Sequence, residues 1–418
     1  MEGLQIYDVV SANPPSWIAR MEKPTEPLRV LVIGAGPTGL LIAQVLKQNG
    51  ISCTVYEQDA YLGARPRDWN FGIYWAQSPL SECLPPELNA QIESVQVDSH
   101  TPSADDTMSI FNGQTAELLN VIPAPYTLRL QRLKFIKLIS TGVDIRYGKR
   151  LANIHTKGET ATATFEDGST ETGNLVIGAE GAHSKVREFL FGKEKAALKP
   201  SPLVASFTIA RLDKQAALDM RKLHPRHSIA FHPKGFFVWV GVHNLDPDNP
   251  EEWLFMLGQS WISEEPTGLH SRPDITRDLK KRAEELAPPF RAAFESIADD
   301  TPIWHNRLSY WVTEPWDNRN GTVTLAGDAA HSMTFHRGQG LNNAILDVAH
   351  LGRRLAEMKS KTHASLCQAV SGYEKEVWTR GREAVLSSNE NSLSIHDWVK
   401  LQNSPLFRAG LRQKVDSS

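Results

Sequence analysis

Apolar residues near the start of the chain change their spacing in a way that predicts three successive elements. Residues 30–33 form a continuous apolar run, which is typical of a strand buried on both faces. Apolar positions from Leu40 to Leu46 then follow a helical period, and residues 53–56 predict a second short strand. The order strand, helix, strand predicts a βαβ unit at this end of the protein.

The rest of the chain gives a mixture of strand and helix signals. Alternating residues on both sides of Asp167-Gly168 predict a hairpin within residues 151–177, because this dipeptide favours a tight turn. Other strands are predicted at residues 143–147, 228–231, 236–242, 252–257 and 322–326. Helices are predicted at residues 132–139, 276–298 with a break near Pro288 and Pro289, 341–358, and most of the chain from there to about residue 400.

The turn after the first strand carries the most specific chemistry. Gly34, Gly36 and Gly39 have the G-x-G-x-x-G spacing: the first allows a tight turn, the second allows a pyrophosphate to approach the backbone, and the third allows close packing of helix on strand. Free amides at the helix N-terminus suit a negatively charged pyrophosphate. Glu57 ends the second strand, where a carboxylate can accept hydrogen bonds from an adenosine ribose. These features together predict a dinucleotide site.

The amino-acid composition excludes some classes of protein but does not identify the function. The 418-residue chain has 41% hydrophobic and 22% charged residues and a formal net charge of −3, so nothing favours a nucleic-acid partner or an anionic membrane. Cys53, Cys83 and Cys367 are widely spaced and form no metal or redox motif, which favours a reducing compartment. No apolar run approaches the roughly 18 residues of a membrane span. We expect a cytoplasmic protein with neither a signal peptide nor a metal site.

Two later constellations also close a strand and open a helix. Gly327-Asp328-Ala329-Ala330-His331 follows the strand predicted at residues 322–326, and Asp328 is suited to accept hydrogen bonds from ribityl hydroxyls. Gly338 and Gly340 precede a helix whose N-terminal amides can stabilise negative charge on a flavin ring. Residues 178–187, GAEGAHSKVR, have the same strand-to-helix character.

These three motifs, in this order, resemble those of the single-component FAD-dependent aromatic hydroxylases, the family of para-hydroxybenzoate hydroxylase. The resemblance extends from Arg29 to about residue 375, and RDWNFGIYWA and GDAAHSMTFHRGQGLNNAILD are most similar to fungal members that modify secondary metabolites. It implies non-covalent FAD, NADPH or NADH as co-substrate, and O2. The implied cofactor-binding residues are Gly34, Gly36, Gly39, Glu57, Arg132, Glu180, Asp328, Gly338, Gly340, Leu341 and Asn342. Arg129 is the second choice for the arginine of this set.

The resemblance also implies an architecture. It is an α/β fold with a Rossmann-like FAD-binding domain of the glutathione reductase type, an inserted mixed β-sheet substrate domain and a C-terminal helical segment. The expected division is an extension at 1–27, FAD-binding segments at 28–75, 123–200 and 301–375, substrate segments at 76–122 and 201–300, and a helical segment at 376–418. Either a monomer or a homodimer is compatible with the sequence.

The sequence departs from the family pattern at two positions. Glu180 stands where the family usually has Asp, and the extra methylene either keeps a pyrophosphate or nicotinamide contact or loosens it. Phe335 stands where the family usually has a proline beside the flavin, and is a candidate wall of the substrate pocket.

Catalytic residues are not identified by the sequence, because in this family the cofactor carries the reactive chemistry. The candidates are Arg67, Tyr74, Trp239 and His232, and for each an ordinary surface or core role is an open alternative. Alternate side chains of residues 236–240 should face either the substrate or the core of the sheet, so Phe237 or Trp239 can stack on a ring. His331 is expected to order its own turn rather than act as a base.

The implied reaction is monooxygenation. Reduced FAD reacts with O2 to give a C4a-hydroperoxide, which hydroxylates or epoxidises an aromatic, indole or polyene molecule. Two alternatives stay open: a flavin-dependent halogenase, whose W-x-W-x-I-P stretch has no match at residues 237–242, and an FAD-binding reductase or redox-silent flavoprotein.

Overall fold

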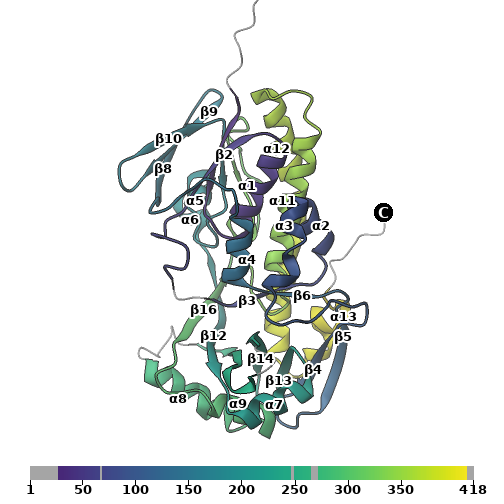
Figure 1. Ribbon diagram of the computed structural model, residues 1–418. Helices are drawn as coiled ribbons and strands as arrows, with labels where there is room; N and C mark the ends of the chain where they lie inside the picture. Colours follow the sequence, from purple (N-terminus) through teal and green to yellow (C-terminus); the bar gives the residue numbers. More distant parts are fainter. Residues whose placement is uncertain (1–26, 66–67, 246–248, 265–271, 412–418) are drawn as a thin grey trace, which may run out of the picture.

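The computed structural model describes residues 27–65, 68–245, 249–264 and 272–411. These residues form an elongated molecule with two β-sheet regions (Figure 1). A five-stranded parallel sheet occupies the upper part and a seven-stranded mixed sheet the lower part. The short ribbon of β3 (Asn70–Ile73) and β6 (Leu128–Gln131) lies where the two parts meet.

The parallel sheet is assembled from distant segments of the chain. Its strands are ordered β17 (Val323–Leu325), β11 (Leu175–Gly178), β1 (Arg29–Ile33), β2 (Ser52–Tyr56) and β7 (Ile145–Arg146). All four neighbouring pairs are parallel. The predicted βαβ unit is thus confirmed, and β11 and β17, which carry the two later motifs, lie beside β1.

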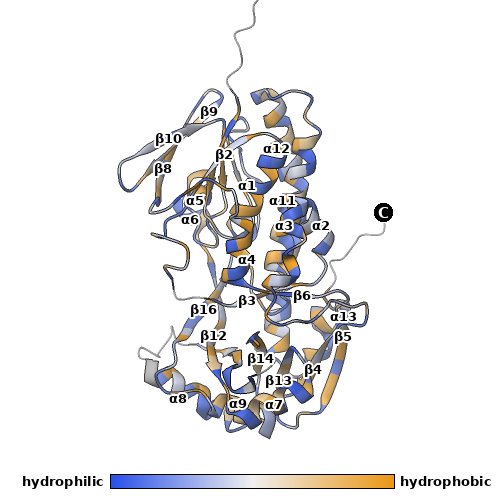
Figure 2. Ribbon diagram, viewed as in Figure 1, coloured by the Kyte–Doolittle hydropathy of each residue, from blue (hydrophilic) through white to orange (hydrophobic). Residues whose placement is uncertain are grey.

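Helices cover this sheet because their apolar faces need burial. α1 (Pro37–Gln48) packs against α11 (Gly340–Ala356), and α11 packs against the long helix α12 (His363–Ile395). In Figure 2 the hydrophobic colour is concentrated on α1 and the strands beside it. Smaller elements complete this region: α2 (Gln77–Cys83), α3 (Pro86–Asn89), η1 (Ile92–Val95), α4 (Arg132–Ile139), α5 (Lys185–Phe191), α6 (Lys193–Ala196) and α10 (Asp328–His331).

The hairpin predicted around Asp167-Gly168 is confirmed. β9 (Thr160–Phe165) and β10 (Thr170–Gly173) pair antiparallel, and β8 (Leu151–Lys157) joins β9 to give a three-stranded sheet. The region predicted as one or two helices forms α8 (Arg272–Ala283) and α9 (Pro288–Glu295), which begins at the expected proline pair. Among the described helices, none is long and apolar enough to cross a membrane.

The seven-stranded sheet makes up most of the lower part. Its order is β16 (Ile303–Tyr310), β12 (Lys199–Arg211), β15 (Leu254–Ile262), β14 (Phe236–Asn244), β13 (His227–His232), β4 (Thr107–Asn112) and β5 (Leu118–Pro123). β13 and β4 are parallel and the other neighbours are antiparallel, so the sheet is mixed, as predicted.

The two faces of this sheet have different neighbours. Val238 and Val240 belong to an apolar cluster with residues of α7 (Lys214–Leu223), α8 and α9. Because side chains alternate along a strand, Phe237 and Trp239 point to the opposite face, towards the β3–β6 ribbon and the C-terminal end of the chain. There α12 is followed by η3 (Leu401–Asn403) and α13 (Pro405–Ala409), and η2 (Pro250–Glu252) lies before β15. We call the face that carries Phe237 and Trp239 the inner face.

Three packing relationships bear on the expected division of the chain. Residue 376 lies inside the uninterrupted helix α12, and β16 pairs with β12 in the seven-stranded sheet. Leu80, Cys83 and Leu88 pack into the core around β1 and α1. We therefore propose that residues 77–95 and all of α12 are grouped with the parallel sheet and that β16 is grouped with the substrate sheet.

The carboxylate of Glu374 links α12 to the parallel sheet and generates a pH prediction. It accepts hydrogen bonds from Trp316 Nε1 (2.9 Å), Thr324 Oγ1 (2.7 Å) and Asn318 Nδ2 (2.7 Å). Burial raises the pKa of Glu374 to about 7, although these donors oppose the shift. The folded state therefore holds this proton more tightly than the unfolded chain, so the stability contribution of Glu374 should fall as pH rises from about 4.5 to about 7.

We expect the free energy of unfolding to lose roughly 3 kcal/mol through this group over that pH window. Urea unfolding of the wild type and of Glu374→Gln across the window measures the effect, because the variant has no proton to release there. Equal pH dependence in the two proteins would contradict the assignment.

Candidate cofactor and substrate site

The turn between β1 and α1 crosses the backbone of the β11 segment so closely that side chains are excluded. Gly34 has φ +105°, and a Cβ there would lie 2.6 Å from the Ala179 carbonyl oxygen. A Cβ on Gly39 would lie 1.9 Å from the Gly34 carbonyl oxygen. A Cβ on Gly36 would meet no atom within 4 Å. Gly34 and Gly39 are thus needed for packing, whereas Gly36 borders open space in which a ligand can approach.

Helix α1 begins with its amides uncapped by any side chain. Gly36 is the N-cap, Pro37 occupies the first turn, and that turn contains no acidic residue. A 12-residue helix with such an N-terminus favours an anion at the glycine turn.

Glu57 lies at the end of β2 beside this turn. Its Oε2 accepts the Ala35 amide at 2.8 Å and its Oε1 accepts the Asp59 amide at 2.9 Å. A carboxylate has capacity for further donors, so two ribose hydroxyls can still bind. Burial lowers the pKa of Arg132, and the charges of Asp68, Asp59 and Glu57 oppose that shift, which locates Arg132 in the same neighbourhood.

Glu180 follows β11 at the N-terminus of α5. Its Oε1 accepts the Val186 amide at 2.8 Å, whereas its Oε2 is buried without a hydrogen-bond partner among the described residues. Burial raises the pKa of Glu180, and backbone donors around Val186 oppose the rise. One oxygen therefore binds the first turn of α5, and the other is a buried acceptor close to Gly178.

Asp328 is presented by a tight turn after β17. The residue is exposed, yet the surrounding protein removes enough water to raise its pKa, and the charge of Asp347 adds to the shift. A Cβ on Gly340 would lie 3.7 Å from Asp328 Oδ1, so the structure brings the turn after β17 close to the glycine loop before α11. Arg187 joins this turn to the turn after β11, because it donates to the carbonyl oxygens of Ala329 (3.0 Å) and Ala182 (2.5 Å).

A buried carboxylate fixes the position of this turn. Asp347 Oδ2 accepts the Gly327 amide and His331 Nε2, both at 2.7 Å, and its Oδ1 accepts Arg380 Nη2 at 2.5 Å. His331 thus orders its own turn, as expected. Arg187 and Arg380 have positioning roles that sequence reasoning missed, because their partners are backbone carbonyls and a residue on another helix.

The residues before and within the first turn of α11 have unequal roles. Asn342 is fully buried, its Oδ1 accepts the Tyr74 amide (2.9 Å), and its Nδ2 donates to the Gly72 and Gly338 carbonyl oxygens (both 2.9 Å). Its side chain therefore joins β3 to α11 and has no further donor for a ligand. Gly340 and Leu341 are half-buried, and α11 has neither a side-chain cap nor an acidic residue in its first turn.

These features fit FAD on physical grounds. FAD has two phosphates, hydroxyl groups and a ring that becomes negative on reduction. The site offers two uncapped helix N-termini and a glycine that borders open space, which suit negative charge. It also offers the spare acceptors of Glu57 and Asp328 and the unpartnered Glu180 oxygen, which suit hydroxyl groups.

Comparison with known proteins identifies the family. The FAD binding domain family matches residues 128–385, and the NAD(P)-binding Rossmann-like domain family matches residues 32–81. The FAD-dependent monooxygenase cctM of Talaromyces islandicus is 58% identical over 394 residues, covering 94% of this chain and 99% of the relative. The chain belongs to the FAD-dependent monooxygenases. FAD is its cofactor, NAD(P)H its co-substrate, and O2 and a small molecule its substrates.

Other relatives agree with this family. The FAD-dependent monooxygenase phnB of Penicillium herquei is 35% identical over 387 residues, covering 91% of this chain and 94% of the relative. Klebsiella pneumoniae HpxO, solved in complex with FAD and uric acid, has a TM-score of 0.72 at 20% identity, covering 90% of this chain and 91% of that one. That likeness supports the fold predicted from the sequence. The halogenase alternative receives no support.

The catalytic candidates of the monooxygenase lie in different parts of the structure. Tyr74 and Trp239 belong to one apolar cluster at the inner face. His232 stacks on Phe236 (4.3 Å between centroids) on the opposite, helix-covered face and lies 3.2 Å from the Glu285 carbonyl oxygen. Being paired with Phe236 on that face, His232 does not reach the inner face. Arg67 lies outside the described residues.

Phe335 lies among aromatic rings at the inner face. It is 37% exposed, and its ring stacks on His336 (4.1 Å) and contacts Phe207 (5.1 Å) and Phe237 (6.2 Å) edge-on. His336 is itself held by the hydroxyls of Ser260 and Ser392, each at 2.8 Å. The side chain that replaces the family's usual proline therefore sits on a fixed support.

The glycine turn of the monooxygenase predicts opposite outcomes for two alanine substitutions. Gly36→Ala should fold like the wild type, since Gly36 has φ −73° and its Cβ would enter open space, but it should bind FAD at least tenfold more weakly. Gly39→Ala should lose at least about 2 kcal/mol of stability, because its Cβ collides with backbone. Thermal unfolding of the FAD-free proteins and titration with FAD measure both effects. Normal FAD affinity in Gly36→Ala would contradict the pyrophosphate assignment.

Proposed function

We propose that this monooxygenase adds oxygen to a planar aromatic molecule, with hydroxylation as the reaction and fungal secondary metabolism as the setting. The observation that carries the proposal is the group of aromatic side chains Phe207, Phe237 and Phe335 at the inner face, close to the glycine loop before α11. Aromatic side chains favour stacking and edge contacts with another aromatic ring over contacts with an extended polyene chain. The same arrangement of rings is compatible with an indole substrate or with epoxidation, but it favours neither of them over hydroxylation of another planar aromatic molecule.

The residues proposed to hold FAD act on separate parts of it. The N-terminus of α1 with Gly36 binds the pyrophosphate, Glu57 binds the adenosine ribose, and Asp328 binds ribityl hydroxyls. Arg132 and the free oxygen of Glu180 complete the polar contacts. The N-terminus of α11, with Gly338, Gly340 and the backbone of Leu341 and Asn342, stabilises negative charge on the ring.

When bound, FAD supplies redox chemistry with NAD(P)H and activation of O2. The protein contributes binding, orientation and exclusion of water. Phe335 covers one side of the proposed substrate position, and His336 keeps Phe335 in place because both ring nitrogens of His336 are engaged by serine hydroxyls. No side chain is assigned a proton transfer. A cytoplasmic location and a monomeric or homodimeric state belong to the same proposal.

Anaerobic reduction of the bound FAD is the experiment that tests this function. Purified holoenzyme is mixed with NADPH or NADH, with and without phenolic, indolic and polyene compounds, and flavin absorbance is followed. We expect a flat phenolic compound to accelerate reduction at least tenfold, and its product in air to gain the mass of one oxygen atom.

Acceleration by a polyene and by none of the aromatic compounds would overturn the proposed substrate class. Failure of both nucleotides to reduce the FAD under every condition would overturn direct NAD(P)H-driven hydroxylation. A product that gains only hydrogens would indicate a reductase.

Phe335→Ala should uncouple oxygen consumption from product formation. Removing the ring opens the side of the site that Phe335 covers, so water enters and a larger share of NAD(P)H is spent on hydrogen peroxide. The ratio of peroxide to product should rise at least threefold, with FAD content unchanged. Leu119→Ala is the matched control, because Leu119 has the same exposure (37%) on β5, an edge strand separated from β12 by β15, β14, β13 and β4. An unchanged ratio in Phe335→Ala would refute its covering role.

A further inference from the structure

We propose that Arg129 binds an anionic oxygen of the substrate, a phenolate or an aryl carboxylate, at the inner face of the seven-stranded sheet. The inference rests on the proposed function, since it names a recognition group for the aromatic substrate of that site. It assigns to Arg129 a role other than the FAD contact for which it was the second choice.

Arg129 lies on the β3–β6 ribbon, which crosses the inner face. The Arg129 guanidinium lies 4.3 Å from the centroid of the Trp239 ring. Two further contacts join ribbon and sheet: Asn70 Nδ2 donates to the Val242 carbonyl oxygen (3.2 Å), and Gln131 Nε2 lies 3.3 Å from His243 Nε2. The ribbon therefore holds polar side chains against a face that elsewhere is aromatic and apolar.

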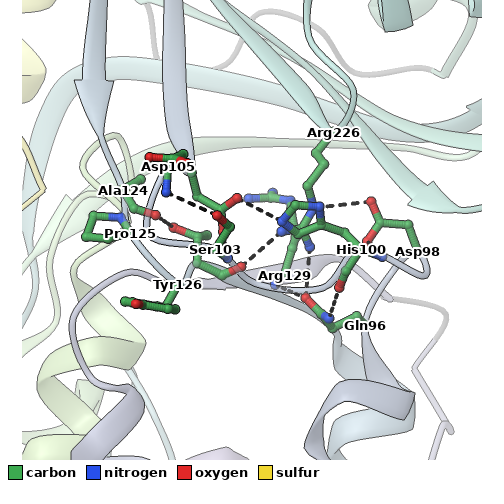
Figure 3. Close-up of polar contacts among 12 residues, drawn as sticks. Gln96, Asp98, His100, Ser103, Asp105, Ala124, Pro125, Tyr126, Arg129 and Arg226 are labelled. Carbon is green, nitrogen blue, oxygen red and sulfur yellow. Dashed lines mark hydrogen bonds and ion pairs between the residues drawn. The ribbon is translucent and has the colours of Figure 1, made fainter.

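The charges buried in this region do not balance. Arg226 Nε and Asp98 Oδ2 form an ion pair at 3.1 Å, with both side chains less than a tenth exposed. Arg226 is further satisfied by the Thr127 carbonyl oxygen (3.0 Å) and by Gln96 Oε1 (2.9 Å), as Figure 3 shows in part. Gln96 Oε1 also accepts the backbone amide of Arg129 (3.2 Å). The Asp98 carboxylate thus lies near the buried guanidinium groups of both Arg226 and Arg129, and it forms its ion pair with Arg226.

Arg129 is left as the surplus cation. It is 3% exposed, it makes no ion pair within the described part of the chain, and its Nε is buried without a hydrogen-bond partner there. Burial lowers the pKa of Arg129 to about 10, with the Tyr74 hydroxyl and the more distant Asp98 opposing the shift and Arg226 adding to it. The guanidinium therefore stays charged at neutral pH, and a buried charge without a partner is costly.

Neutral polar atoms around Arg129 are also unsatisfied. Besides Arg129 Nε, six buried side-chain atoms of this region have no hydrogen-bond partner in the residues that the structure describes: Asn70 Oδ1, Gln131 Oε1, His227 Nδ1, His227 Nε2, Trp239 Nε1 and His243 Nδ1. Water can satisfy the neutral atoms, but it does not neutralise the guanidinium. An anionic oxygen neutralises the guanidinium and accepts from a donor such as Trp239 Nε1, whereas the amide oxygens of Asn70 and Gln131 are left to water. A guanidinium binds a carboxylate through two parallel donors.

Tyr74 connects this position to the proposed flavin position. A Cβ on Gly338 would lie 2.5 Å from Tyr74 Cε2, so the Tyr74 ring fills the space against the glycine loop before α11. The same residue's hydroxyl interacts with Arg129. The Tyr74 ring therefore lies between the guanidinium and the loop, and an aromatic substrate anchored by its oxygen at Arg129 would lie beside Tyr74.

Binding of matched charged and uncharged compounds to the FAD-loaded, full-length protein tests the proposal. The probes are 2,4-dihydroxybenzaldehyde with its dimethyl ether, at a pH where the phenol is ionised, and 4-hydroxybenzoate with 4-hydroxybenzamide. Dissociation constants are measured from the perturbation of flavin absorbance in the wild type, Arg129→Gln and Arg129→Lys. Arg221→Gln is the matched control, because Arg221 also lies over a tryptophan ring (Trp253, 4.8 Å) but on the helix-covered face.

We expect the wild type to prefer the charged member of at least one pair by tenfold or more, and the pair concerned tells a phenolate from a carboxylate. Arg129→Gln should lose that preference, Arg129→Lys should keep part of it, and Arg221→Gln should behave as the wild type. Because no carboxylate depends on Arg129, Arg129→Gln should retain its FAD and unfold at a temperature no lower than the wild type.

Three results would overturn the proposal: a wild type that binds neither charged probe, a wild type without preference in both pairs, or an Arg129→Gln variant that keeps the preference. If Arg129→Gln fails to fold, Arg129 has a structural role and the anion assignment falls unless Arg129→Lys shows a reduced preference. FAD content separates these failures from failure of the proposed function, since a protein that holds and reduces FAD but ignores anions remains a monooxygenase.

Discussion

The carboxylate of Asp347 is the interaction on which the cofactor side of this monooxygenase depends. Burial alone would raise the pKa of Asp347, but His331 and Arg380 reverse the effect and bring it to about 2. The same carboxylate accepts the Gly327 amide, so one buried charge joins the turn after β17 to helices α10, α11 and α12. Losing it would leave the Gly327 amide and His331 Nε2 without their acceptor, whereas Arg380 would keep its ion pair with Glu376. The placement of Asp328 follows from this arrangement.

Local chemistry explains why the nucleotide part was predictable. Gly39 is constrained by the Gly34 carbonyl oxygen five residues earlier, and Gly34 has a positive φ, so their spacing indicates strand, turn and helix even though the close contact of Gly34 with Ala179 could not be foreseen. Glu57 could be assigned by its distance along the chain from the turn. The hairpin at Asp167-Gly168 and the break before α9 were predictable for the same reason, because a dipeptide or a proline pair determines the local backbone.

Contacts between distant segments were not predictable. The alternation along β14 indicates that Phe236 and Phe237 point to opposite faces, but only the fold decides which face receives α7, α8 and α9. His232 therefore looked equivalent to residues that reach the inner face, and it lies on the other side. Arg129 and Arg132 were separated only by their fit to a family pattern. Their surroundings, one beside Trp239 and the other beside Asp68 and Glu57, depend on how β6 crosses the large sheet.

The seven-stranded sheet shows how stability and function are divided between its faces. Val238, Val240 and Phe255 pack with the helices in an apolar cluster in which burial is favourable at every position. The inner face has the opposite character where the ribbon crosses it, with a surplus guanidinium and unsatisfied nitrogen and oxygen atoms. A fold optimised for stability alone would place apolar residues there, as it does one residue away along the same strand. The helix-covered face therefore supplies stability that lets the inner face keep polar groups without partners in the described part of the protein.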